Sequence, residues 1–186
     1  MRIYSFVFAS LLVFCHSATF ASQYIQFIDE QNGFKVFYPS SWDRLSSPLP
    51  TVKLLIKNCF LCGHQEILSI VVDSAGEFRG KSADSYFKKN DPEKLVKSGI
   101  KTIYPDAKFV KSGKLNIGKY DAPYILSHYT LKKSDVRVGR ALLQAYIIRG
   151  NFLYTVSWGS HQKYFDKMMP VFKRIISTFE FTNGKL

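Results

Sequence analysis

Apolar and polar side chains alternate with a period of two through much of the second half of the chain. The alternation occupies four consecutive segments, residues 109–115, 122–131, 136–148 and 152–158. A period of two puts successive side chains on opposite faces of a strand, so each segment is predicted to be a β-strand. Gly150 and Asn151 supply a two-residue hairpin between the last two segments. Four strands in succession, with no helix between them, predict antiparallel pairing.

Shorter apolar runs predict further strands in the first half and at the end of the chain. A hairpin is expected at the start of the domain, because Asn32-Gly33 is a turn signal between two such runs. A second strand pair and a short closing strand are also expected. The predicted strands are residues 24–27, 34–38, 52–56, 67–72 and 177–181.

Besides a short helix that Ser82 can cap and that runs through Phe87, two longer helices are predicted around these strands. The first starts at residues 91–93, Asp-Pro-Glu, which combine a cap residue, a first-turn proline and an early acid. The second covers residues 165–176, where apolar side chains recur at helical spacing. Pro170 lies within it, so this helix either kinks there or gives way to a new helix. The face of the last long strand that carries Trp158 is expected to meet a helix layer.

The first 21 residues have the pattern of a cleavable secretory signal. Arg2 precedes a short apolar run that ends in small residues, and Ala21 is the expected cleavage position. An uncleaved membrane anchor is the alternative, although the run is short for a membrane span. The prediction is therefore a signal peptide at 1–21, a single α+β domain at 22–186, and a periplasmic or secreted location with no transmembrane segment in the mature chain.

The chain is strongly basic. It has 26 Lys and Arg against 14 Asp and Glu, and removal of Arg2 with the signal leaves 25 minus 14, a formal charge of +11. The lysines are dispersed, which favours an anionic protein or envelope surface as partner or simply increases solubility. Nucleic acid is disfavoured as a partner, because an exported protein does not meet the genome and no recognition motif is present. The sequence does not indicate an oligomeric state.

Cys59 and Cys62 are the two cysteines that remain after removal of the signal. In an oxidising compartment, a disulfide between them is the first expectation. As a Cys-x-x-Cys pair they could instead act in a thiol oxidoreductase. Together with His64 they could also supply three ligands to a metal ion, although a fourth ligand is not evident. Disulfide, redox and metal-binding interpretations therefore remain open, and no cofactor is predicted.

No arrangement of residues in the sequence predicts catalysis. A Gly-x-Ser-x-Gly nucleophile elbow is absent, and Ser160 next to His161 does not by itself make a triad. Glu66 flanks a predicted strand, so a structural or solvated role is expected for it. Trp42 and Trp158 could line a ligand site between sheet and helix, but large aromatic residues more often fill cores. The protein is predicted not to be an enzyme.

Three phrases of the sequence, spread over most of the mature chain, carry a family resemblance. They are residues 33–42 (GFKVFYPSSW), 118–123 (GKYDAP) and 170–179 (PVFKRIISTF). They resemble the PsbP-like family, named for an extrinsic subunit of the photosynthetic oxygen-evolving complex and widespread among secreted bacterial proteins. The resemblance implies an antiparallel sheet of about six strands flanked by helices, and an accessory or binding role without catalysis. It does not imply photosynthesis.

Overall fold

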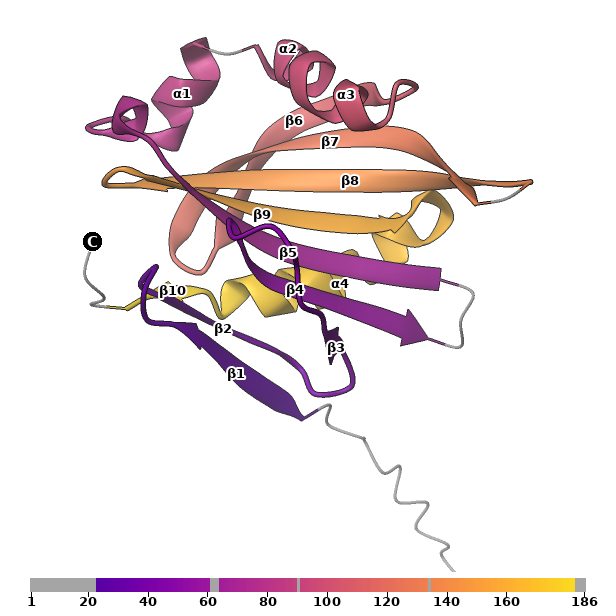
Figure 1. Ribbon diagram of the computed structural model, residues 1–186, viewed down its shortest axis with the longest axis horizontal. Helices are drawn as coiled ribbons and strands as arrows, with labels where there is room; N and C mark the ends of the chain where they lie inside the picture. The colour runs from indigo at the N-terminus through magenta and orange to yellow at the C-terminus, as the bar shows by residue number, and fades with distance from the viewer. Residues whose placement is uncertain (1–22, 61–63, 90, 134, 183–186) are drawn as a thin grey trace, which may run out of the picture.

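The computed structural model describes residues 23–60, 64–89, 91–133 and 135–182. It confirms the predicted α+β fold with antiparallel sheets and few helices (Figure 1). The strands are β1 (Tyr24–Asp29), β2 (Phe34–Pro39), β3 (Asp43–Arg44), β4 (Val52–Phe60), β5 (His64–Ser74), β6 (Lys108–Ile117), β7 (Tyr120–Lys133), β8 (Val136–Arg149), β9 (Phe152–His161) and β10 (Glu180–Phe181).

The strands form two antiparallel sheets. Seven strands pair in the order β3-β4-β5-β9-β8-β7-β6, and three pair in the order β1-β2-β10. The resemblance implied about six strands, so the main sheet is slightly larger than expected and a second sheet is added. The predicted hairpin between β8 and β9 is present, with Gly150 at a φ of 62° and Arg149 paired with Phe152.

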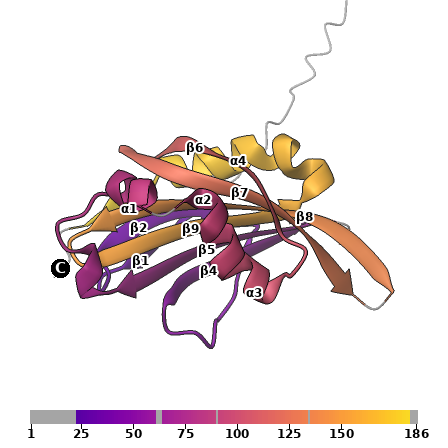
Figure 2. The same ribbon diagram turned by 90° about the horizontal axis from the view of Figure 1, so that it is seen from above.

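Three short helices cover part of one face of the seven-stranded sheet. They are α1 (Ala83–Lys89), α2 (Pro92–Leu95) and α3 (Lys101–Ile103), and a π-helical turn joins the last two. The predicted start is confirmed, because the Asp91 side chain accepts a hydrogen bond of 2.9 Å from the Glu93 amide. Figures 1 and 2 show these helices together on one side of the sheet. Val96 and Ile100 are buried against Ile125 of β7, which holds this layer on the sheet.

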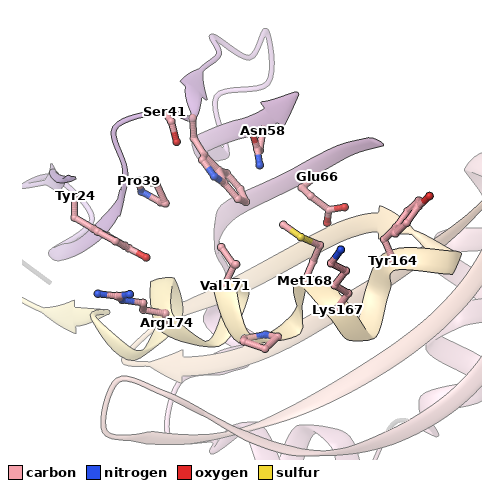
Figure 3. Close-up of a pocket in the computed structure, with 12 residues that line it drawn as sticks. Tyr24, Pro39, Ser41, Asn58, Glu66, Tyr164, Lys167, Met168, Val171 and Arg174 are labelled. Atoms are coloured by element: carbon pink, nitrogen blue, oxygen red, sulfur yellow. The ribbon is translucent and has the colours of Figure 1, made fainter. Parts of the chain in front are cut away.

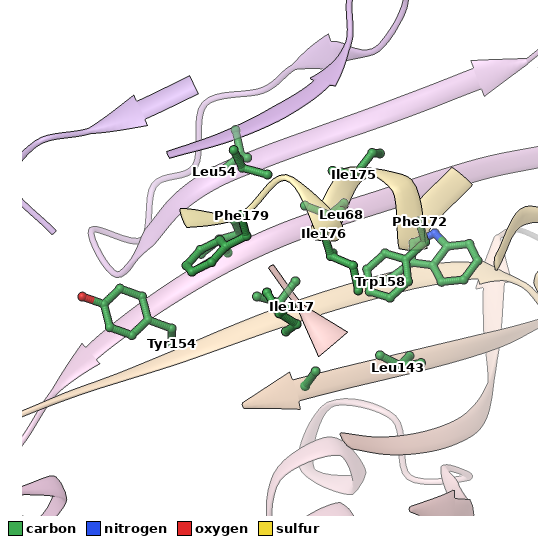
Figure 4. Packing of buried hydrophobic residues seen from close by; sticks show 14 of the residues in the cluster. Leu54, Leu68, Ile117, Leu143, Tyr154, Trp158, Phe172, Ile175, Ile176 and Phe179 are labelled. Carbon is green, nitrogen blue, oxygen red and sulfur yellow. The ribbon is translucent and has the colours of Figure 1, made fainter. Parts of the chain in front are cut away.

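The long helix α4 (Phe165–Ser177) and the three-stranded sheet cover the other face. Pro170 lies inside this single helix, so of the two expected arrangements the chain does not start a new helix there. The Trp158 ring stacks against the rings of Phe165 and Phe172, with centroids 4.9 and 4.8 Å away. The expectation that this face of β9 meets a helix is therefore confirmed (Figure 4).

One long-range hydrogen bond ties the two sheets together. The Tyr154 hydroxyl of β9 donates to the Asn32 carbonyl, in the turn between β1 and β2, over 2.8 Å. Both residues are buried, so the bond is shielded from water. Within the described part of the chain, no helix has the length and apolar character needed to cross a membrane.

Candidate functional site

A groove of about 660 Å³ lies between α4 and the strands β1, β2, β4 and β5 (Figure 3). This size falls within the usual range of small-ligand pockets. Its wall is largely apolar, formed by Pro39, Trp42, Met168, Pro170 and Val171. The groove is a candidate site because it joins this apolar wall to a few polar groups, the usual composition of ligand sites.

Glu66 supplies a buried carboxyl group to the groove. Only 2% of its surface is exposed. The Ser160 hydroxyl on the neighbouring strand β9 donates a 2.9 Å hydrogen bond to its Oε1 atom. Its Oε2 atom makes no hydrogen bond of standard geometry with the described residues, although the Trp158 indole interacts with the same carboxyl and lowers its pKa.

The position of Glu66 differs from the expectation that it merely flanks a strand. Strand β5 begins at His64, so Glu66 lies within it and points to the same face as the buried Leu68 and Ile70. The alternation with a period of two indicates this placement, because Glu66 is in phase with the apolar positions of its strand. The partner Ser160 lies 94 residues away in sequence and gives no such signal.

The environment of Glu66 favours its neutral form. Burial raises the pKa of this carboxyl above its ordinary value of 4.5, because the charged form loses hydration. The Ser160 hydrogen bond, the positive charge of Arg140 and the nearby Trp158 indole oppose that increase. Burial outweighs them, and the net direction is upward.

This direction predicts how stability depends on pH. The unfolded chain releases the Glu66 proton near pH 4.5, whereas the folded protein holds it to a higher pH. We expect the free energy of unfolding of the native protein, relative to Glu66→Gln, to fall as the pH rises above 4.5. The decline should end once the pH exceeds the folded-state pKa. Urea titrations over a pH series measure this difference in the free energy of unfolding. Parallel plots of free energy against pH for the two proteins would contradict the prediction.

Two cations of α4 stand at the edge of the groove. Lys167 and Arg174 are both exposed and line it. Neither forms an ion pair with any described residue. The Arg174 guanidinium lies over the Tyr24 ring, 5.1 Å from its centroid, which orients the side chain toward β1. The two cations are seven positions apart in the helix, which places them about 10.5 Å apart along its axis and nearly on one face.

The two tryptophans have different positions. Trp42 is 6% exposed and lines the groove, so it serves both as core and as wall. Trp158 is part of the core, stacked against α4. Its buried Nε1 atom makes no hydrogen bond of standard geometry with the described residues, although the indole interacts with the Glu66 carboxyl. The sequence expectation of a core role therefore holds for Trp158 and is incomplete for Trp42.

The sequence motif around the cysteines lies largely outside the described residues. Cys62 is not described, and the side chains of Cys59 and His64 are not described either. The backbone of Cys59 lies in β4 and pairs with Gln65 of β5. The disulfide, thiol oxidoreductase and metal-binding interpretations of Cys59, Cys62 and His64 therefore stay predictions.

Comparisons with known proteins identify a family and solved structures with a similar fold. The model of the PsbP family matches residues 22–181. No curated protein matches the chain. The solution structure of cyanobacterial PsbP (CyanoP) from Synechocystis matches with a TM-score of 0.56 at 14% identity, covering 88% of this chain and 95% of that chain.

Two further solved structures share the fold. LpqN of Mycobacterium tuberculosis, described as involved in cell envelope biogenesis, matches with a TM-score of 0.50 at 13% identity, over 86% of this chain and 91% of that chain. The Ran-binding protein Mog1p of Saccharomyces cerevisiae matches with a TM-score of 0.52 at 7% identity, over 87% and 96%. At these identities the likeness concerns the fold alone. The family match over residues 22–181 shows that the chain belongs to the PsbP family.

Proposed function

We propose that this protein is a non-enzymatic binding module that acts in the periplasm or outside the cell. Residues 1–21 would direct its export, and residues 22–186 would form the single functional domain. Its partner would be an anionic macromolecule or envelope surface. The observation that carries the proposal is the groove beside α4, with Lys167 and Arg174 at its edge, neither of them ion-paired with a described residue.

Two further features support this proposal. The basic composition, with 26 Lys and Arg against 14 Asp and Glu, speeds encounter with anionic partners. Membership of the PsbP family supports an accessory role, although a fold alone is a weak guide to function. Lys167 and Arg174 place two of these positive charges beside the groove, where they can contact a bound anionic partner.

A charge-matched pair of variants tests the binding role. The double variant Lys167→Gln/Arg174→Gln removes two positive charges at the groove, and Lys88→Gln/Lys89→Gln removes two from exposed positions on α1. We expect the groove variant to bind an immobilised extracytoplasmic extract about tenfold more weakly at low salt, the sum of two moderate charge contacts. The α1 variant should bind almost normally. Added salt should reduce the difference.

The proposal fails on either of two results. Equal binding of the two variants would show that only overall charge matters and that the groove does not. Cell fractionation provides the second criterion, because the protein should leave the cytoplasm when residues 1–21 are present and remain there when they are deleted. Retention of the native protein in the cytoplasm would refute the export role of this segment.

A further inference from the structure

Exposed apolar side chains gather at one end of the seven-stranded sheet, where β6 and β8 begin and β7 ends. Of the eight large apolar side chains that are exposed in the described part of the chain, five lie here. They are Ile103 of α3, Phe109 and Val110 of β6, Leu131 of β7 and Val136 of β8, and we call them the apolar end. Ile103 and Val136 are the most exposed of the eight, at 71% and 61%. Such a concentration of exposed apolar side chains typically marks an interaction surface.

Contacts between the end of α3 and β7 bring these residues to one face of the sheet. The Tyr104 ring, directly after α3, stacks on the Tyr129 ring of β7 with the centroids 3.9 Å apart. Leu131 lies two residues beyond Tyr129, so it points to the same face. Val138 pairs with Leu131, and Val136, two residues before Val138, shares that face as well. The ends of β7 and β8 extend beyond the other strands, so this face protrudes (Figure 1).

The same end of the sheet is strongly basic. Residues 93–111 and 131–137 contain eight Lys and Arg against three Asp and Glu. Two of the three acids are engaged within the protein. The Glu93 carboxylate forms an ion pair with Lys97 over 3.0 Å, and Asp106 accepts a hydrogen bond from a backbone amide of β7. The excess of positive charge therefore favours an anionic surface as the partner.

A small pocket at this end joins the positive charge to the apolar side chains. It has a volume of about 240 Å³, and Lys97, Lys101, Lys108 and Phe109 line it. Glu93, the partner of Lys97, also lines it, whereas Lys101 and Lys108 form no ion pair with any described residue. A phosphate group would find ammonium groups here, and an apolar chain attached to it would find Phe109. A phospholipid combines these two groups in one molecule.

We propose that the apolar end docks on an anionic lipid bilayer, with Ile103, Leu131 and Val136 inserted among the headgroups and the neighbouring lysines on lipid phosphates. This surface lies on the opposite face of the sheet from the groove, so the inference goes beyond the proposed binding function. Insertion is shallow, because lysines beside the apolar side chains keep their ammonium groups at the level of the phosphates.

The mixture of residues favours a lipid surface over a protein partner. Lys101 lies two residues before Ile103, and Lys132 directly follows Leu131. Lysine is depleted from the cores of protein–protein interfaces, because its ammonium group loses hydration there. At a bilayer surface the same ammonium group stays hydrated and meets phosphate, so lysines next to apolar residues are typical of membrane-surface binding.

Cosedimentation with vesicles of defined composition tests the inference. The vesicles contain phosphatidylglycerol and phosphatidylcholine in equal parts, and the control vesicles contain phosphatidylcholine alone. With the purified native protein at low salt, we expect saturable binding to the anionic vesicles and about tenfold weaker binding to the control vesicles. Lys101→Gln/Lys132→Gln should weaken binding about thirtyfold, because each lysine near an anionic surface contributes a factor of about five. Lys88→Gln/Lys89→Gln, on α1, should change it less than about threefold.

Substitution of the apolar residues separates insertion from attraction by charge alone. Ile103→Asn/Val136→Asn should weaken vesicle binding about tenfold. The matched control is Ile28→Asn/Leu49→Asn, at positions 49% and 60% exposed in β1 and before β4, and it should bind within about twofold of the native protein. Thermal unfolding confirms that each variant is folded. If Ile103→Asn/Val136→Asn does not fold, Ile103→Asn alone takes its place, with binding about threefold weaker.

Equal vesicle binding by the two apolar double variants would overturn the inference, as would failure of the native protein to bind the anionic vesicles. Loss of binding to a lipid-free extract by Ile103→Asn/Val136→Asn, when the native protein binds no vesicles, would show that a protein covers this end instead.

The groove variant keeps this test separate from the proposed function. Lys167→Gln/Arg174→Gln should bind vesicles within about threefold of the native protein, although it loses binding to the extract. Weakened vesicle binding by the groove variant alone would place the lipid at the groove, which overturns this inference and leaves the proposed function intact. Normal extract binding by the groove variant, with vesicle binding lost only in the variants of the apolar end, would refute the groove function and support this inference.

Discussion

Replacement of Gly118 by alanine is expected to cost more than about 4 kcal/mol of the free energy of unfolding, an exceptional loss for one methyl group. Gly118 has a φ of 55°, a conformation that L-residues with side chains rarely adopt. An added Cβ atom would also lie 2.0 Å from the Phe179 carbonyl oxygen, a backbone atom that has little freedom to move. The Gly118 amide donates to the Ile176 carbonyl over 2.8 Å, which fixes the turn at this place.

Gly150 provides the control for this substitution. Its φ is 62°, close to that of Gly118, but a Cβ atom there would meet nothing within 4 Å. Gly150→Ala should therefore cost only the conformational penalty, about 1 to 2 kcal/mol. Urea denaturation of both variants isolates the contribution of the close approach at Gly118. Equal losses would show that the turn between β6 and β7 moves away from the end of α4 with ease.

Removal of the Phe172 ring is the second substitution with a large expected effect. Phe172 is 1% exposed and stacks on Trp158 with an angle of 12° between the ring planes. Phe172→Ala would leave a cavity between α4 and β9, and we expect a loss of about 3 to 5 kcal/mol. A loss of this size is a large part of the stability of an ordinary domain, about 5 to 15 kcal/mol.

Phe109→Ala makes the same chemical change at the sheet edge. Phe109 lies on the edge strand β6 and is 36% exposed, so its removal leaves no enclosed cavity. Its cost should stay below about 1 kcal/mol. Chemical denaturation compares the two variants directly. Similar losses would mean that α4 repacks onto the sheet, and that the stacking with Trp158 contributes little.

The sequence predicts the local parts of this fold well. The strands β6 to β9 follow from an alternation that each segment carries by itself, and Gly150 marks the turn between β8 and β9. The cap at Asp91 is equally local. The strands β3 and β10 have only two residues each, too few for an alternation to be seen. The division into two sheets depends on pairings such as that of β10 with β2, which no short pattern encodes.

The sequence predicts the groove less completely than it predicts the strands. The sequence indicates Trp42 as a possible lining residue, and the alternation in β5 places Glu66 on the buried face. No sequence pattern distinguishes Lys167 and Arg174 from the other Lys and Arg residues, of which the chain has 26 in total. Only the folded structure brings α4 against β1, β2, β4 and β5 and shows which two of its cations border an apolar wall.

The walls of the groove come from opposite ends of the domain. β1 and β2 are its first strands, and α4 is its last helix. The Thr178 hydroxyl, directly after α4, accepts a hydrogen bond from the Phe37 amide across 141 residues. During synthesis, the site therefore cannot exist until α4 has emerged and docked. Proteolysis that removes α4 would abolish binding, so occupancy of the groove would report that the domain is intact at both ends.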